Sequence, residues 1–138
     1  MLRILIPYGT TEGQTARIAD YLAQMIRGWG HEAYPTNIEA GVPAPAGYDA
    51  VIVGASVHRG KHQQGVRDYV RRNLPALEHL PSAFFSVSLA IQEGTEEGRR
   101  EAAGYVETFV RETGWRPGKV GLFAGALLYT RYGFFLRW

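Results

Sequence analysis

The stretch ILIPYGTTEGQTARIADYL, residues 4–22, joins an apolar run to a helical pattern through a cluster of hydroxyl, amide and glycine residues. The apolar run Leu2–Pro7 has the length and composition of a buried strand. From Thr15 to Trp29, apolar residues recur every three or four positions, which is the spacing of an amphipathic helix. The sequence therefore predicts a strand, a polar loop and a helix in direct succession.

Four further apolar runs and two further helical patterns follow this unit. We expect strands at Glu32–Ile38, Ala50–Ser56, Ser82–Ala90 and Lys119–Leu128, and helices at Gln64–Asn73 and Thr95–Thr113. Strands that alternate with helices predict a parallel sheet with helices on both faces, an α/β three-layer sandwich. Pro35 favours an edge position for the second strand, because an edge tolerates the loss of an N–H donor. No linker divides residues 1–138, so we expect one domain.

Composition narrows the classes of function. The chain has 138 residues, of which 46% are hydrophobic, and a formal net charge of +2 without any basic block. This balance gives no reason to expect a nucleic-acid partner. The absence of cysteine excludes disulfides, thiolate metal sites and a cysteine nucleophile, and we expect no metal centre. The sequence shows no membrane-spanning stretch or signal peptide, so we expect a cytoplasmic protein.

The loop after the first strand has the chemistry of a phosphate site. Its residues are Thr10, Thr11, Glu12, Gly13, Gln14 and Thr15. A helix N-terminus presents unpaired N–H groups to an anion, and the hydroxyls and the amide of this loop can complete the shell of donors. The loop contains no lysine or arginine, which suits a phosphomonoester held by neutral donors. The alternative is that Thr11 or Thr15 only caps the helix.

Other phosphate and signalling motifs are absent. The loop lacks the Gly-Lys-Ser/Thr ending of a nucleotide-hydrolysing loop, and Gly9 and Gly13 do not form the dinucleotide pattern G-x-G-x-x-G. Pro7 and Tyr8 end the first strand and Gly54 lies in the third, where a receiver-type signalling domain needs acidic residues.

The segment TTEGQT resembles the phosphate loop of flavodoxins, T/S-x-T-G-x-T, although Glu12 replaces the second threonine of that pattern. The chain is more closely similar to the menaquinone-dependent protoporphyrinogen IX dehydrogenases of the flavodoxin superfamily. The supporting stretches are YDAVIVGASVHRGKHQQGVRDYVRRN, LPSAFFSVSLA and GWRPGKVGLFAGALLYTRYGFF. The resemblance implies a flavodoxin-like sheet of order 2-1-3-4-5, with FMN as cofactor and its phosphate at Thr10–Thr15.

The resemblance also implies an activity and a place for the flavin ring. The activity is oxidation of protoporphyrinogen IX, a step of haem biosynthesis, with a quinone as electron acceptor. The ring would lie between the loops after the third and fourth strands, against Ala55, Ser56, Val57, Ser86, Val87, Ser88, Leu89 and Ala90. Ser86 and Ser88 could equally satisfy their own backbone. The alternatives to this activity are a flavodoxin-type electron carrier and an interaction module without a cofactor.

The third loop carries a basic cluster, formed by His58, Arg59, Lys61 and His62. One hypothesis is that Arg59 binds propionates of a porphyrinogen and that His58 or His62 accepts a proton. The alternative is a solvated loop without a role in binding.

The chain ends in the aromatic segment LLYTRYGFFLRW, residues 127–138. Aromatic and cationic residues together are favoured at a membrane interface, which suggests peripheral contact with the inner face of the membrane. The alternative is an end that packs on a neighbouring molecule. The resemblance implies a further helix after this segment, so either the chain is truncated or one sheet face is left partly bare.

Overall fold

A computed structural model describes residues 1–11, 13–91, 95–124 and 134–137, and a parallel sheet forms its centre. The sheet runs in the order β2 (Glu32–Asn37), β1 (Arg3–Tyr8), β3 (Ala50–His58), β5 (Ser82–Ser88) and β6 (Lys119–Ala124), all parallel neighbours. This is the predicted order 2-1-3-4-5, and β2 is the edge strand that Pro35 indicated. All five carboxyl ends therefore meet at one side of the sheet.

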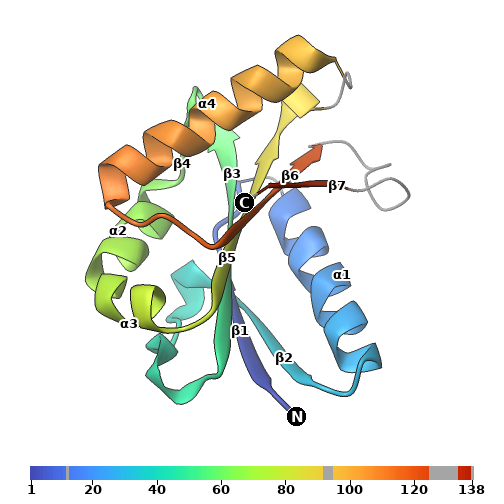
Figure 1. Ribbon diagram of the computed structural model, residues 1–138, viewed down its shortest axis with the longest axis vertical. Helices are drawn as coiled ribbons and strands as arrows, with labels where there is room; N and C mark the ends of the chain where they lie inside the picture. The colour runs from blue at the N-terminus through green and yellow to red at the C-terminus, as the bar shows by residue number, and fades with distance from the viewer. Residues whose placement is uncertain (12, 92–94, 125–133, 138) are drawn as a thin grey trace.

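Helices cover both faces of this sheet, as the alternating pattern predicted (Figure 1). α1 (Gln14–Gly28) packs on one face, and α2 (Gln64–Arg72), α3 (Leu74–His79) and α4 (Glu96–Thr113) pack on the other. Neighbouring side chains of a strand point to opposite faces, so Phe84 joins the core under α2 and α4 while Phe85 joins the core under α1. The central strands are buried on both sides, which explains their continuous apolar runs.

One α-helix and two strands of the described residues were not predicted. α3 begins at Leu74, where a helix end was expected before Pro75; proline is tolerated there because the first turn of a helix needs no N–H acceptor. β3 extends to His58 and turns back as β4 (Lys61–His62), where a loop was expected. β7 (Phe134–Arg137) pairs antiparallel with β6.

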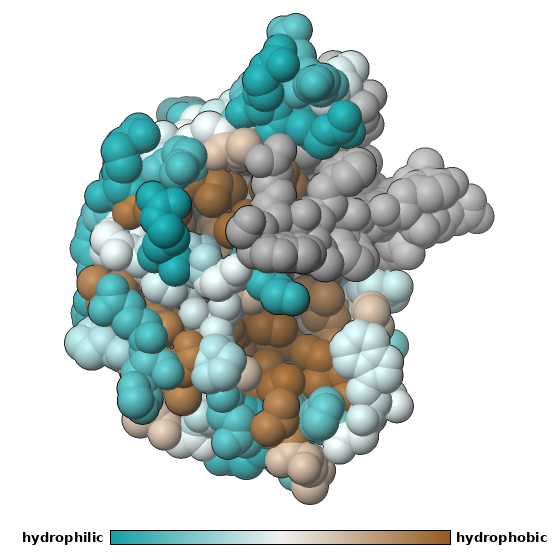
Figure 2. All heavy atoms as spheres, viewed as in Figure 1, coloured by the Kyte–Doolittle hydropathy of each residue, from teal (hydrophilic) through white to brown (hydrophobic). Residues whose placement is uncertain are grey.

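The face that carries α1 remains partly open. Figure 2 shows apolar residues exposed over the sheet beside this helix, where a shallow groove is lined by Ala50, Ile52 and Ala83 among others. Within the described ranges, no helix combines the length and the apolar character that a bilayer crossing requires. The predicted membrane-contact segment falls largely on residues 125–133 and 138, which lie outside the described part of the chain.

Gly54 in β3 leaves room for the ring of Phe85, its partner residue in β5. A Cβ atom at this position would lie 2.0 Å from Cζ of the Phe85 ring, far inside van der Waals contact. Phe85 is itself buried and cannot swing into solvent. The position therefore excludes every residue larger than glycine.

We predict that Gly54→Ala lowers the free energy of unfolding by about 1–3 kcal/mol, the usual cost of overpacking a core. The control is Gly104→Ala in α4, where a Cβ would meet no atom within 4 Å. That substitution should raise stability by roughly 0.5–1 kcal/mol, because alanine favours a helix interior. Urea unfolding of both variants measures the difference, and equal stabilities would contradict this packing.

Candidate functional site

A cleft lies at the carboxyl ends of β1, β3 and β5. It is lined by Thr10, Thr11, Gln14, Thr15, Ser56, Val57, His58, Val87, Ser88 and Leu89. Nine of these ten residues were predicted to bind the cofactor, and the tenth, His58, was a candidate for proton transfer. The topology brings them together because parallel strands deliver their following loops to one edge of the sheet.

The first loop passes close to the third strand and to α2. The N–H of Gly9 donates to the carbonyl of Gly54 at 3.0 Å, which continues the pairing of β1 with β3. A Cβ on Gly9 would lie 2.5 Å from Cγ2 of the buried Val66, so the loop can take this path only with glycine. The close approach fixes where the loop begins.

No described side chain caps the N-terminus of α1. Its N-cap residue is Gly13, which has φ +89°, and its own N–H donates to Oγ1 of Thr10 at 2.8 Å. The alternative that Thr11 or Thr15 caps this helix is therefore wrong. The first turn also holds no acidic residue, so the partial positive charge of the helix faces the cleft without a counter-charge in that turn.

Two buried polar atoms at this helix start have no partner among the described residues: Oγ1 of Thr15 and Oε1 of Gln14. Thr15 is fully buried. An unsatisfied buried hydroxyl costs roughly 1–3 kcal/mol, so its presence beside a cleft indicates a missing acceptor. A hydroxyl, free backbone N–H groups and the helix dipole together form a donor set that fits a phosphate.

The two serines of β5 have internal partners. Oγ of Ser86 lies 2.7 Å from Nε2 of His62, inside the core, and Oγ of Ser88 accepts from the N–H of Ala90 at 3.1 Å. Ser88 lines the cleft, whereas Ser86 and Ala90 do not. Leu89, which is 72% exposed, forms the rim.

Four predicted cofactor residues do not line the cleft: Gly13, Ala55, Ser86 and Ala90. Ala55 is fully buried within β3, and Gly13 acts through its backbone conformation. A fifth, Glu12, lies outside the described residues.

The predicted basic cluster does not form one surface. Lys61 lies 2.9 Å from a carboxylate oxygen of Glu112, and that hydrogen bond is the main reason that the pKa of Glu112 is lowered. Arg59 is exposed at the tip of the β3–β4 turn, with φ +56°. His62 points the other way, with 3% of its surface exposed, and contacts the stacked rings of Phe84 and Phe109 edge-on. Its placement in a basic surface cluster was therefore wrong.

Burial lowers the pKa of His62 to about 4; the positive charge of Arg67 acts in the same direction, and Glu112 opposes it. The imidazole is therefore neutral at pH 7, which suits its contacts with two aromatic rings and the Ser86 hydroxyl. Its described contacts hold the β3–β4 hairpin against the core, outside the cleft lining.

The fold and the cleft define a flavodoxin-like ligand-binding domain, and comparison with known proteins agrees. The chain belongs to the flavodoxin domain family, whose pattern matches residues 5–138. It is 33% identical over 137 residues to the protoporphyrinogen IX dehydrogenase (quinone) of Escherichia coli strain K12, covering 99% of this chain and 75% of that protein. The protein of the same name from Leishmania major is 33% identical over 143 residues, covering 98% and 59%.

Solved structures show the same fold at lower sequence identity. Oxidised flavodoxin 1 from Bacillus cereus superposes with a TM-score of 0.60 at 18% identity, covering 88% of this chain and 84% of that chain. A Fusobacterium nucleatum flavodoxin bound to flavin mononucleotide gives 0.52 at 18% identity, covering 87% and 69%.

We predict that acid unfolds this protein partly through His62. An unfolded histidine has a pKa near 6.5, so between pH 6.5 and 4 the unfolded chain binds a proton that the folded chain does not. Stability should therefore fall by on the order of 2 kcal/mol from pH 7 to pH 5 through this residue alone. Urea unfolding at both pH values measures the loss.

The comparison for this prediction is between two histidine substitutions. His62→Gln should remove most of the loss of stability between pH 7 and pH 5 that His62 causes. His79→Gln changes an exposed histidine and should leave that loss as it is in the wild type. Identical pH profiles for the two variants would show that His62 does not titrate in this way.

Proposed function

We propose that this chain binds FMN in the cleft, with the phosphate at residues 10–15 and the ring between residues 56–58 and 87–89. The hydroxyl of Thr15 at the start of α1 carries the proposal: it is buried and has no partner in the described part of the chain, and a phosphate oxygen would supply the missing acceptor. Thr11 and the backbone of the first turn of α1 supply further donors. Val57, Val87 and Leu89 supply apolar contacts for a flat ring.

We further propose an oxidoreductase that converts protoporphyrinogen IX to protoporphyrin IX in three two-electron oxidations. Each oxidation passes two electrons and two protons to one quinone, so three quinones become quinols for each porphyrin formed. The support is the 33% identity to relatives named for this activity. Bound FMN would supply the redox chemistry, and the protein would supply binding, orientation and electrostatics. The proposal includes contact with a membrane surface through the aromatic segment, residues 127–138, since quinone acceptors are lipid-soluble.

Arg59 is the substrate-binding candidate in this proposal. It is exposed, forms no ion pair within the described residues, and follows His58, which lines the cleft. The positive φ of Arg59 is a backbone conformation that glycine adopts with less strain than a residue with a side chain. Strained residues of this kind are often found at functional sites. A guanidinium here suits a carboxylate side chain of a porphyrinogen.

We predict that the protein binds FMN more tightly than riboflavin, which lacks the phosphate. Thr15→Val, which keeps the shape of the side chain, should weaken FMN binding about tenfold and leave riboflavin binding nearly unchanged. Thr108→Val on α4, outside the cleft lining, is the matched control. Titrations followed by flavin fluorescence measure both constants; equal affinity for the two flavins would refute the phosphate site.

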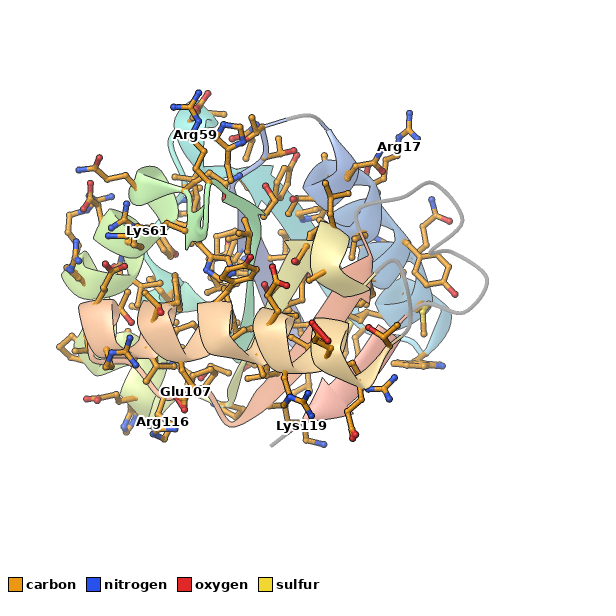
Figure 3. All side chains as sticks on the ribbon, turned by 90° about the horizontal axis from the view of Figure 1, so that it is seen from above. Arg17, Arg59, Lys61, Glu107, Arg116 and Lys119 are labelled. Carbon is orange, nitrogen blue, oxygen red and sulfur yellow. The ribbon has the colours of Figure 1, made fainter. Side chains whose placement is uncertain are left out.

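We predict that Arg59→Ala raises the KM for protoporphyrinogen IX about tenfold, as expected for a lost charged hydrogen bond. Arg116→Ala is the control. Arg116 is exposed, and Figure 3 shows it at the bottom edge of the molecule, whereas Arg59 lies at the top edge. Turnover is measured with a menaquinone analogue as acceptor. Unchanged turnover in Arg59→Ala and His58→Ala would remove this loop from the proposal.

The same assay distinguishes the proposal from a flavodoxin-type electron carrier. A carrier would bind FMN and exchange electrons but would not turn over protoporphyrinogen IX. A colourless preparation that binds no flavin would instead indicate an interaction module.

A further inference from the structure

One side chain connects the two halves of the cleft. Gln63 reaches across from the residue before α2 and contacts both the first loop and the end of β3. Its Oε1 accepts the N–H of Ser56 at 3.0 Å, and its Nε2 donates to Oγ1 of Thr11 at 3.1 Å and to Oγ of Ser56. Thr11 and Ser56 both line the cleft.

The hydrogen bonds fix the orientation of this amide. The N–H of Ser56 can only donate, so the amide atom opposite it must be the oxygen. The NH2 group then faces the two hydroxyl oxygens, and each of its hydrogens has its own acceptor. Both hydroxyls are thereby used as acceptors.

A hydroxyl that accepts one hydrogen bond still has its own hydrogen to donate. Because Gln63 occupies an acceptor position on Thr11 and on Ser56, the two hydroxyl hydrogens are left for the cleft. We propose that Gln63 is a positioning residue that sets Thr11 as a donor to the phosphate end of the ligand and Ser56 as a donor to its ring end. This inference rests on the proposed binding of FMN.

The surroundings of Gln63 hold its side chain in place. His62 before it is buried against the stacked rings of Phe84 and Phe109, and Val66 after it is fully buried. The backbone carbonyl of Gln63 accepts the N–H groups of Val66 and Arg67, both at 3.2 Å. Gly9 lies close to the side chain of Gln63: a Cβ atom placed on Gly9 would be 3.5 Å from Oε1 of Gln63. The residues on both sides of Gln63 in the sequence are therefore held in place, and this holds its amide at the cleft.

The test compares Gln63→Glu with Gln64→Glu. A carboxylate at position 63 has no donor, so both hydroxyls would turn toward it, and its charge would repel the phosphate. Gln64 is exposed, next in sequence and absent from the cleft lining, so Gln64→Glu adds the same charge without touching either hydroxyl. Gln63→Met is a second variant, which keeps the length of the side chain and removes all of its hydrogen bonds.

We expect Gln63→Glu to raise the Kd for FMN at least about tenfold and the Kd for riboflavin by less, because only FMN carries the phosphate. Gln63→Met should weaken the binding of both flavins, and FMN more than riboflavin, because FMN loses the oriented donors of both Thr11 and Ser56 whereas riboflavin loses only that of Ser56. Gln64→Glu should match the wild type. In flavin-free protein, hydrogen exchange at the Ser56 N–H, followed by NMR, should be faster in Gln63→Met than in the wild type.

Three different results would overturn the inference. If the wild type binds FMN but Gln63→Glu and Gln64→Glu have the same Kd, Gln63 does not position the hydroxyls. If the wild type binds neither flavin, the proposed function fails and this inference fails with it. Loss of thermal stability alone, with both Kd values unchanged, would show a purely structural role.

Discussion

The start of α1 has unsatisfied hydrogen-bonding capacity, and the whole cleft depends on it. A helix begins with N–H groups that no residue of the same helix can accept, and a side chain usually accepts one of them. Here the N-cap is Gly13 and the hydroxyl of Thr15 is buried without a described partner. The sequence thus retains a small cost in stability at a helix end that faces the carboxyl edge of the sheet.

The remaining strands and loops position this helix end against two other loops. Gly9 brings the first loop within contact of α2, and Gly54 in β3 leaves room for the ring of Phe85 from β5, in the two strands whose ends carry cleft residues 56–58 and 87–89. Glycine is needed at both positions because a neighbouring side chain already fills the space that a Cβ would take. The two positions link the packing of the core to the shape of the site.

Apolar runs alternating with helical patterns predicted the parallel sheet, and the polar helix start predicted the phosphate side of the cleft, because both are strong local signals. The strand order and the ring side of the cleft were implied by the resemblance to flavodoxins. It did not predict β4 or α3, since a two-residue strand has no periodicity to detect and Pro75 looked like a helix end. His62 was misplaced for a related reason. Consecutive residues of a strand point to opposite faces, so Lys61 and His62 could not both be on one basic surface once β4 had formed.

Gln63 shows a different limit. Nothing in the sequence distinguishes it from Gln64, since both are glutamines at the start of a helix. Only the three-dimensional arrangement shows that one amide contacts two cleft hydroxyls while the other is exposed. A residue whose role is to orient its neighbours carries no motif of its own.

The edge strand β2 affects how readily molecules of this protein associate at high concentration. An open sheet edge is a template on which another chain can add a strand, and natural proteins protect such edges. In β2, Pro35 offers no N–H, and the carbonyl of Ala33 already accepts from the guanidinium of Arg27 at 2.8 Å. This edge is therefore a poor starting point for intermolecular β-sheet aggregation.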